Sequence, residues 1–540
     1  MENRGDLKSI LPYLPLMDQT SSLIWPRPVA EELDAMSRGP SNTKVNSGEA
    51  LASRISSMRR SLSLDPSLLK PFALEGYAVF FDRKISREES GKWFGEVFPA
   101  LARLLLRLPS MLEMHYQKAD HVLDGITTGL RILDPQEAGI VFLSQELIAA
   151  LLACSFFCLF PESERASRHL RGINFHELFS YMHTRQSKNH ENKIRCIIHY
   201  FERICCCMPM GFVSFERKVL PFSHHPLLVS YPTSDSWNKS ITSLCPIEVH
   251  TSGSIEDQTG EALEVDFADE YFGGLTLRNG CVQEEIRFMI NPELIAGMMF
   301  LPRMDDNEAI EIVGVERFSH YTGYGASFQF SGDYVDKKEL DIFRRRKTRV
   351  IAIDAMPRTG TRQYKPEGLL REVNKALCGF LHQCTYHVSV SQGIPLQTDT
   401  NPADPVQSET LSTGPVHLQP VVMSKDPDSS CQKQRLCCYY NEEKIGVATG
   451  NWGCGIFKGD PELKTMIQWL AASQSGRPFL SYYTFELEAL QNLDQVTKWI
   501  GSQEWTVGDL WSKLVEYSSE KLSERTRAGL FSWLIPSLSA

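Results

Sequence analysis

The spacing of hydrophobic residues changes near residue 208, and this change divides the chain in two. From about residue 65 to residue 207, apolar side chains recur every three or four positions, which is the period of one buried helix face. This spacing is seen at Trp93, Val97, Leu101, Leu104 and Leu105, and again at Leu147, Leu151, Cys154 and Cys158. The pattern predicts an all-α module over residues 65–207, preceded by a polar, partly helical extension over residues 1–64.

After residue 208, short β-branched segments alternate with helical ones. The expected strands cover residues 246–250, 262–267, 311–318, 349–356, 444–450 and 479–485. Two intervening helices have recognisable starts, because Asn291 and Asp460 are each followed by proline, an N-cap signal. The first helix is expected over 293–300, and the second from Pro461 to near Gly476. This alternation predicts a layered α/β domain over residues 208–540.

Residues 389–435 follow neither pattern. They are rich in Ser, Thr, Pro, Gln and Asp and have little periodicity, which predicts a disordered or poorly ordered loop inserted into the α/β domain. The alternative is a hinge between two domains. We favour the loop because strand-like sequence resumes at Lys444 and would complete the same sheet.

Composition limits the classes of function. The 540 residues exceed one average domain, and 56 basic against 66 acidic side chains give a net charge of −10. An acidic chain is poorly suited to general binding of nucleic acid, which needs basic surfaces. An anionic ligand would therefore have to be held by a local site.

The cysteines and apolar runs indicate the compartment. Three of the 14 cysteines are consecutive at 205–207, and no pair has zinc-knuckle spacing, so we expect reduced thiols and no metal. The longest apolar run, 147–160, is shorter than the roughly 18 residues of a membrane span, and the N-terminus lacks a signal-peptide pattern. We expect a soluble intracellular protein. The basic run 344–347 is expected to be a solvated patch, with a nuclear import signal as the alternative.

Three segments have residues suited to chemistry. A strand ends near Asp266, and Gly273-Gly274 follows shortly after. Glycines let a backbone approach a ligand and leave N–H groups for phosphate oxygens, although a lone Gly-Gly pair is more often an ordinary turn. Glu284 and Glu285 have apolar neighbours on both sides. Partial burial would raise a carboxyl pKa and permit general acid catalysis, but adjacent carboxylates also decorate solvated helices.

The third segment is the glycine-rich loop 450–457, between an expected strand and the helix opened by Pro461. Such a loop before a helix N-terminus suits a diphosphate, but a tight turn explains it equally well. It lacks the lysine and spacing of a P-loop and the glycine pattern of the dinucleotide fold. A further loop, 319–325, places aromatic residues beside glycines, which suits closure over a nucleotide as well as simple packing.

Together these segments resemble the poly(ADP-ribose) glycohydrolase family, most closely its plant members. The resemblance covers roughly residues 90–540 and is carried by segments 143–146, 156–158, 265–268, 273–274, 282–288, 291–294, 321–324 and 448–455. It implies a helical accessory domain followed by a macrodomain-like three-layer α/β/α sheet domain. It also implies hydrolysis of the ribose–ribose O-glycosidic bonds of poly(ADP-ribose) to release ADP-ribose, without a cofactor or metal.

The resemblance also implies roles for individual residues. Glu285 would be the general acid/base, Glu284 would orient ribose hydroxyls, and Asp266 would be the third acidic residue. The implied substrate-binding residues are Ile255, Glu256, Asp269, Gly273, Gly274, Gln283, Tyr324, Asn451, Trp452, Gly453, Cys454, Gly455, Phe457 and Phe485. The sequence departs from the family at Leu275, where many members have a third glycine.

The family resemblance sets further expectations about partners. We expect a monomer of the nucleus and cytoplasm that acts in the DNA damage response on poly(ADP-ribose) chains of modified proteins, without direct contact to nucleic acid or membrane. A rival hypothesis is a reader macrodomain that binds ADP-ribose without hydrolysing it. A weaker one is a helical interaction scaffold beside an inert α/β domain.

Overall fold

The N-terminal part of the chain is built mainly from helices. A computed structural model describes residues 4–19, 22–123, 125–183, 188–224, 228–258, 260–382 and 445–539. The α-helices of this part are α1 Gly5–Ile10, α2 Arg27–Ser37, α3 Pro40–Thr43, α4 Gly48–Ser61, α5 Ala73–Val79, α6 Arg87–Lys92, α7 Phe98–Leu106, α8 Leu108–Lys118, α9 Gln145–Phe156, α10 His176–Ser180 and α11 Lys188–Cys206. A short hairpin of β1 Met17–Gln19 and β2 Ser22–Ile24 lies among them.

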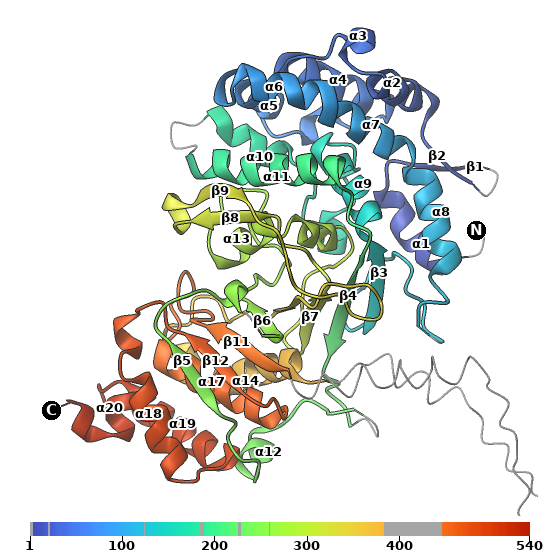
Figure 1. The fold of residues 1–540 in the computed structure, drawn as a ribbon. Coiled ribbons are helices and arrows are strands. Elements are labelled where there is room, and N and C mark those ends of the chain that lie inside the picture. Colours follow the sequence, from blue (N-terminus) through green and yellow to red (C-terminus); the bar gives the residue numbers. More distant parts are fainter. Residues whose placement is uncertain are drawn as a thin grey trace, which may run out of the picture.

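Eight strands form one central sheet in the order β3-β4-β7-β10-β6-β11-β12-β5 (Figure 1). Their bounds are β3 Gly139–Ser144, β4 Phe212–Val219, β5 Ile247–His250, β6 Ala262–Asp266, β7 Glu308–Val313, β10 Arg349–Ala352, β11 Gly446–Gly450 and β12 Leu480–Tyr483. Strands β10, β6, β11, β12 and β5 are parallel, and β7, β4 and β3 continue the sheet antiparallel. The carboxyl ends of parallel strands meet at one edge, where ligands of open α/β sheets bind. Asp266 and Gly450 stand at this edge.

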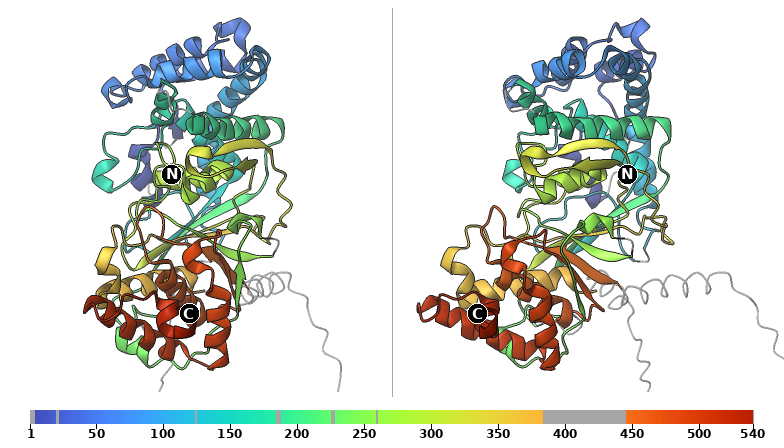
Figure 2. Two further views of the ribbon diagram at one scale, coloured as in Figure 1. Left: turned by 90° about the vertical axis from the view of Figure 1, so that its left-hand side faces the viewer. Right: turned by 60° about the vertical axis from the view of Figure 1, so that its left-hand side comes forward.

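Helices cover both faces of the sheet. On one face, α13 Gln283–Ile290 and the 3-10 helix η8 Pro292–Met299 share a hydrophobic core with the N-terminal helices. On the other face lie α14 Pro366–Phe380, α17 Pro461–Gln474, α18 Leu493–Ser502, α19 Val507–Leu522 and α20 Leu530–Leu534, around a second core. Figures 1 and 2 show these two helical groups at opposite ends of the molecule, with the sheet between them. The short helix α12 Ser234–Asn238 and the hairpin β8 Ser319–Thr322 with β9 Gln329–Asp333 complete the fold.

Most predicted elements of the α/β half are present. The strands expected at 246–250, 262–267, 349–356, 444–450 and 479–485 correspond to β5, β6, β10, β11 and β12. Helix α17 begins as expected, because the Asp460 side chain accepts the N–H groups of Glu462 and Leu463. The strand expected at 311–318 is β7, which ends at Val313 before Gly314 turns the chain at φ 113°. The helix expected at 293–300 is the 3-10 helix η8, without a side-chain cap from Asn291.

The N-terminal half differs from the prediction in two ways. Residues 65–207 are not purely helical, because β3 forms an edge of the central sheet. Its residues 139–143 are all buried, and a strand buried on both faces lacks the alternation by which strands are recognised. The extension 1–64 is part of the same core, since Leu33, Leu51 and Ile55 are fully buried in it. The predicted disordered loop 389–435 lies outside the described residues.

Two further expectations concern membrane-spanning helices and the basic run 344–347. None of the described helices is long and apolar enough to cross a membrane. The basic run is only partly solvated, because Arg345 is buried between Asp341 and Ser214, whereas the ion pair of Lys347 with Glu339 lies at the surface.

Candidate active site

Three buried carboxylates meet where β6 ends and α13 begins. Asp266 is the last residue of β6 and is 1% exposed, while Glu284 and Glu285 lie in the first turn of α13 and are 3% and 5% exposed. The segment between them, residues 267–282, is called the catalytic loop below. This loop brings the start of α13 back against the end of β6. A helix N-terminus favours negative charge through its unpaired N–H groups.

Gln283 fastens the two ends of the catalytic loop together. Its amide nitrogen donates to the carbonyl of Val265 at 3.1 Å, and its amide oxygen accepts the N–H of Phe267 at 2.8 Å. The N–H of Gln283 in turn donates to the hydroxyl of Tyr324 at 3.2 Å. The predicted site residues Gln283 and Tyr324 therefore lie together, with Gln283 in a positioning contact.

Backbone N–H groups of the catalytic loop hold both glutamates. Glu284 accepts from Asp269 at 3.0 Å and from Gly273 at 2.8 Å. Glu285 accepts from Leu275 at 3.1 Å and, as part of the helix start, from Val282 at 2.8 Å. Each carboxylate has about four lone-pair sites, so two sites on each remain for a proton or a ligand. The N–H of Gly273, expected on a diphosphate, is thus already engaged with Glu284.

The glycine pair is required by the local geometry. Gly273 and Gly274 have φ of 86° and 48°, in the left-handed region that favours glycine. A Cβ on Gly274 would lie 2.4 Å from Glu284 Oε2 and 3.1 Å from Glu285 Oε1. Leu275 is not among the residues of positive φ, so its backbone has no need of the third glycine found in many family members.

Burial and mutual repulsion keep protons on the carboxylate cluster. Burial raises the pKa of Asp266 to about 7, with Arg287 opposing and Glu285 adding to the shift. Neither carboxylate oxygen of Asp266 has a hydrogen-bond partner among the described residues. Burial, followed by the charges of Asp266, Glu285 and Asp269, raises the pKa of Glu284 well above its usual range. The cluster therefore holds a proton near neutral pH, as general acid catalysis requires.

The glycine-rich loop after β11 presents free backbone donors beside this cluster. Among the described residues, no acceptor faces the N–H groups of Gly453, Gly455, Ile456 or Phe457. The loop is held from within, because the N–H of Cys454 donates to Asn451 O and that of Gly459 to Gly453 O. Free, preorganised N–H groups form an anion-binding concavity. This loop, rather than the glycine pair, supplies the unused donors.

The side chains of this glycine-rich loop mostly turn inward. Trp452 is fully buried, and its indole N–H donates to Ile353 O at 2.8 Å. Asn451 donates to Thr484 O at 2.9 Å, and Cys454 and Phe457 are partly buried. Trp452 can therefore meet a ligand only through its backbone, while Gly455 and Ile456 are exposed.

The remaining predicted residues lie across the same sheet edge. Gly450 lies between the Phe485 segment and the catalytic loop, since a Cβ there would lie 3.3 Å from the ring of Phe485 and 3.5 Å from that of Phe267. Ile255, in the 3-10 helix η7 Ile255–Asp257, is buried against Ala262, Ala448 and Tyr483. Tyr324 and Phe485 are 57% and 48% exposed, which leaves both rings available to a ligand.

Glu256 is held by Tyr321, whose hydroxyl donates to its carboxylate. The geometry thus gathers Asp266, Asp269, Gln283, Glu284 and Glu285 with the glycine pair around the catalytic loop. Ile255, Glu256 and Phe485 join the glycine-rich loop at the ends of neighbouring strands. No group of His, Cys, Asp and Glu in the described ranges is arranged to hold a metal ion.

Two positions that the sequence analysis missed support this site. Arg287 is buried and pairs with Glu264 at 2.6 Å, beneath Asp266. Lys193, from α11, is fully buried and donates to carbonyls of the catalytic loop. Arg287 lies within the quoted 282–288 motif, whereas Lys193 is about 90 residues away on a helix and has no sequence signal of function.

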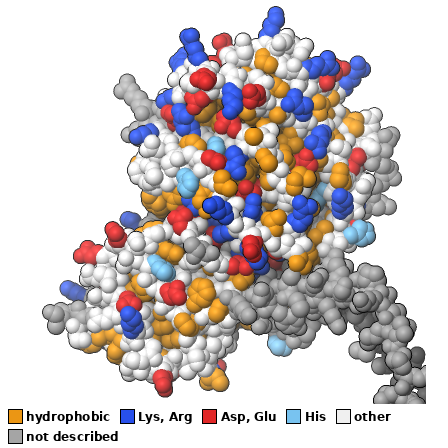
Figure 3. Space-filling view, in the orientation of Figure 1, with side chains coloured by type: hydrophobic (Ala, Val, Ile, Leu, Met, Phe, Trp, Pro, Cys, Tyr) orange, Lys and Arg blue, Asp and Glu red, His pale blue; other side chains and the backbone are white. Residues whose placement is uncertain are grey.

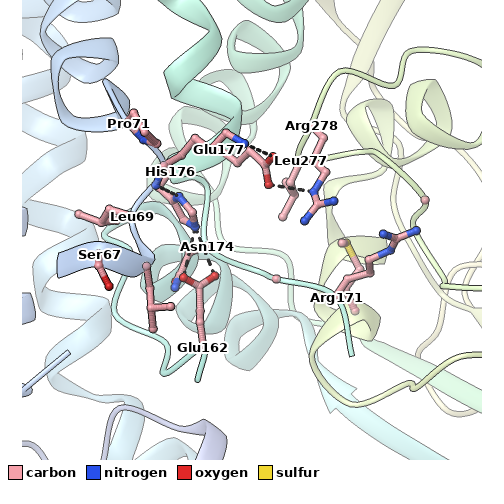
Figure 4. A pocket seen from close by; sticks show the side chains of 15 residues that line it. Ser67, Leu69, Pro71, Glu162, Arg171, Asn174, His176, Glu177, Leu277 and Arg278 are labelled. Carbon is pink, nitrogen blue, oxygen red and sulfur yellow. Dashed lines mark hydrogen bonds and ion pairs between the residues drawn. The ribbon is translucent and has the colours of Figure 1, made fainter. Parts of the chain in front are cut away.

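A cavity of about 390 Å³ lies beside the catalytic loop, between it and the helical module (Figure 4). It is lined by segment 67–71, by Glu162, Arg171, Asn174, His176 and Glu177, and by Gly274, Leu277 and Arg278 of the loop. Arg278 forms an ion pair with Glu177 at 2.8 Å, and the Nε2 atom of His176 lies 3.2 Å from a carboxylate oxygen of Glu162.

Comparison with known proteins matches both parts of the chain. The family model described as Poly (ADP-ribose) glycohydrolase (PARG), helical domain, matches residues 85–217, and the one described as its Macro domain fold matches residues 234–492. "Probable poly(ADP-ribose) glycohydrolase 2" of Arabidopsis thaliana is 66% identical over 100% of both chains. "Poly(ADP-ribose) glycohydrolase 1" of the same plant is 56% identical over 100% of this chain and 98% of its own. The chain therefore belongs to the poly(ADP-ribose) glycohydrolase family, with a macrodomain-fold catalytic part and a helical N-terminal part.

Proposed function

We propose that the protein hydrolyses the ribose–ribose O-glycosidic bonds of poly(ADP-ribose) and releases ADP-ribose. The observation that carries this function is the cluster of Asp266, Glu284 and Glu285, which is buried, holds a proton and is fixed by loop N–H groups. A reader that only binds ADP-ribose has no use for such a cluster, so the reader hypothesis is not favoured. The full-length match to the plant relatives supports the same choice.

In this proposal Glu285 transfers the proton. A proton held by the cluster passes through the Glu285 carboxyl to the ribose oxygen that leaves with the shortened chain, and the glycosidic C–O bond breaks. The resulting carboxylate then takes a proton from water as the water oxygen bonds to the anomeric carbon, which restores the acid. Glu284 orients the ribose hydroxyls. The charges of the cluster stabilise the oxocarbenium-like transition state.

The substrate diphosphate would lie on the glycine-rich loop. The N–H groups of Gly453, Gly455 and Ile456 are unused among the described residues, and backbone donors bind phosphate without adding net charge. This explains how a chain of net charge −10 holds a polyanion. On the face seen in Figure 3, basic and acidic side chains are interspersed, as expected where binding is local.

The adenosine end would extend along the neighbouring strand ends. Ile255 and Glu256 would contact the adenine, and Tyr324 and Phe485 would line the cleft with their exposed rings. Glu256 is preorganised for this role by the hydroxyl of Tyr321.

We further propose that the protein acts as a monomer on chains attached to modified proteins, in the nucleus and cytoplasm, during the DNA damage response. A reducing compartment is consistent with the free thiols of all ten described cysteines. A fluorescent fusion in plant cells tests the location, and sedimentation tests the monomer. Exclusive residence in a secretory compartment would contradict the proposed location.

Purified protein and poly(ADP-ribose) test the activity directly. We expect the wild type to release ADP-ribose. Glu285→Gln should lower kcat by about 10²–10⁴-fold, the usual contribution of a general acid/base, while ADP-ribose still binds. Full activity in Glu285→Gln would reject this residue as the proton donor. A wild type that binds ADP-ribose without turnover would establish the reader instead.

A further inference from the structure

Helix α11 of the helical module runs alongside α13 and the β8–β9 hairpin (Figure 1). It directs one lysine, Lys193, towards the catalytic loop. Lys193 has no exposed surface, and its Nζ donates to Arg278 O at 2.9 Å and to Gly280 O at 2.5 Å. A side chain of the helical module thus holds two carbonyl groups of the catalytic loop.

These carbonyls lie between the two backbone donors to Glu285. Leu275 donates to Oε1 and Val282 to Oε2, and Arg278 and Gly280 lie between them in the chain. The N–H of Gly280 also donates to Leu275 O at 3.2 Å. Gly280 packs so closely that an added Cβ would lie 2.4 Å from Glu285 Oε1. A displacement of the Arg278–Gly280 carbonyls would therefore move the N–H groups that fix Glu285.

Lys193 is a costly residue for this position. Among the described residues no carboxylate forms an ion pair with it; the titratable groups around it are Glu285 and Cys281, and His190 and Cys196 of its own helix. Burial lowers the pKa of the Lys193 ammonium to about 8, which means that the charged form is destabilised. An apolar side chain of similar length would avoid this cost. A residue unfavourable for stability but placed at an active site indicates a functional role.

We propose that Lys193 is a positioning residue for hydrolysis: its ammonium holds the catalytic loop so that the N–H groups of Leu275 and Val282 stay on Glu285. The proposal rests on the proposed function, because positioning matters only if Glu285 transfers the proton. It also gives the helical module a part in the reaction, through the loop that holds Glu285.

Two other contacts join the helical module to the same loop. Glu177 pairs with Arg278 at 2.8 Å at the rim of the cavity in Figure 4, and Arg171 pairs with Asp269 at 3.1 Å. The side chain of Arg278 is 42% exposed, and exposed ion pairs contribute little. These contacts are therefore secondary. Glu177→Gln serves as a comparison, because it removes the ion pair with Arg278 of the same loop and leaves Lys193 unchanged.

The test uses the full chain with Lys193→Met and a matched control, Lys218→Met. Lys218 on β4 is also a buried lysine: its Nζ donates to Gly379 O and Leu381 O at the end of α14 and pairs with Glu311 at 3.1 Å, all outside the catalytic loop. For Lys193→Met we expect kcat to fall about 100-fold, the usual effect of misplacing a catalytic group by about 1 Å. The change in ADP-ribose affinity, measured by calorimetry, should not exceed that of Lys218→Met. Glu177→Gln should stay near wild type.

Amide hydrogen exchange gives a second readout that does not depend on turnover. The backbone amides of Leu275 and Val282 should exchange faster in Lys193→Met than in the wild type, and at the wild-type rate in Lys218→Met. Three results for Lys193→Met would each overturn the proposal. They are wild-type protection of both amides, a kcat equal to that of Lys218→Met, and a loss of ADP-ribose affinity equal to the loss of kcat. A wild type that releases no ADP-ribose would instead overturn the proposed function, and the exchange result would still decide whether Lys193 holds the loop.

Discussion

Replacement of Gly274 by alanine probes the contact between the catalytic loop and the two glutamates. The added Cβ would lie 2.4 Å from Glu284 Oε2 and 3.1 Å from Glu285 Oε1, where ordinary contact begins at 3.4 Å. The shortfall against Glu284 is 3.4 − 2.4 = 1.0 Å. Both glutamates are held by backbone N–H groups of the same loop, so either the carboxylates or the loop must shift by about that distance.

A shift of this size has a calculable effect on rate. Misplacing a catalytic group by about 1 Å costs roughly 100-fold, which corresponds to about 2.7 kcal/mol in the activation free energy. The backbone adds a separate effect on folding, because φ of 48° costs a non-glycine residue about 1–2 kcal/mol. We therefore expect Gly274→Ala to lower kcat about 100-fold and stability by only about 1–2 kcal/mol.

Gly476, which follows α17, supplies the matched control. Its φ is 72°, and no atom lies within 4 Å of an added Cβ, so Gly476→Ala changes the backbone energy without touching the active site. The assay compares the two variants by ADP-ribose release at saturating poly(ADP-ribose) and by urea unfolding. Equal kcat values for the two variants would refute the reasoning, since the contact with the glutamates would then have no consequence.

Three further predictions concern stability. Asp266 has a folded pKa of about 7 against about 3.9 unfolded, so between these pH values the folded state binds more protons and stability falls as pH rises. Asp266→Asn should therefore have a higher urea midpoint than the wild type at pH ~8 but not at pH ~4. An equal difference at both pH values would contradict the raised pKa of Asp266. Asp460→Ala removes the cap of α17 and should cost about 1–2 kcal/mol in urea unfolding; an unchanged midpoint would show that the cap is dispensable. Ile55→Ala should cost about 2–5 kcal/mol in one cooperative transition, because Ile55 is fully buried in the shared core; a separate early transition would show that residues 1–64 fold apart.

The sequence predicted elements that are determined by local interactions. Helix α17 starts at Pro461 because Asp460 caps it through neighbouring N–H groups, and this is a contact within four residues. Four of the five parallel strands are buried throughout, so their apolar runs mark them. The order of β6, the catalytic loop and α13 along the chain also placed Asp266 and Glu284 in one region.

Features that depend on distant contacts could not be predicted. β3 is recognised as a strand only through its pairing with β4, because its own apolar run has no distinguishing period. Trp452 was expected on the ligand, but its indole turns inward to Ile353 O, and no local signal reports which way a loop side chain turns. Gly273 was expected on a diphosphate, whereas its N–H is engaged with Glu284.

The sequence by itself determined the family and the two-part organisation and singled out the paired glutamates as candidates, because these follow from short motifs and local periodicity. The tertiary structure alone decided which backbone N–H groups hold the two glutamates and that burial raises the pKa of Glu284. The pKa of a carboxyl depends on burial and on neighbouring charges, and these come from segments far apart in the chain. Lys193 is the clearest case: a lysine with no sequence signal of function holds two carbonyl groups of the loop before α13, because α11 packs beside that loop.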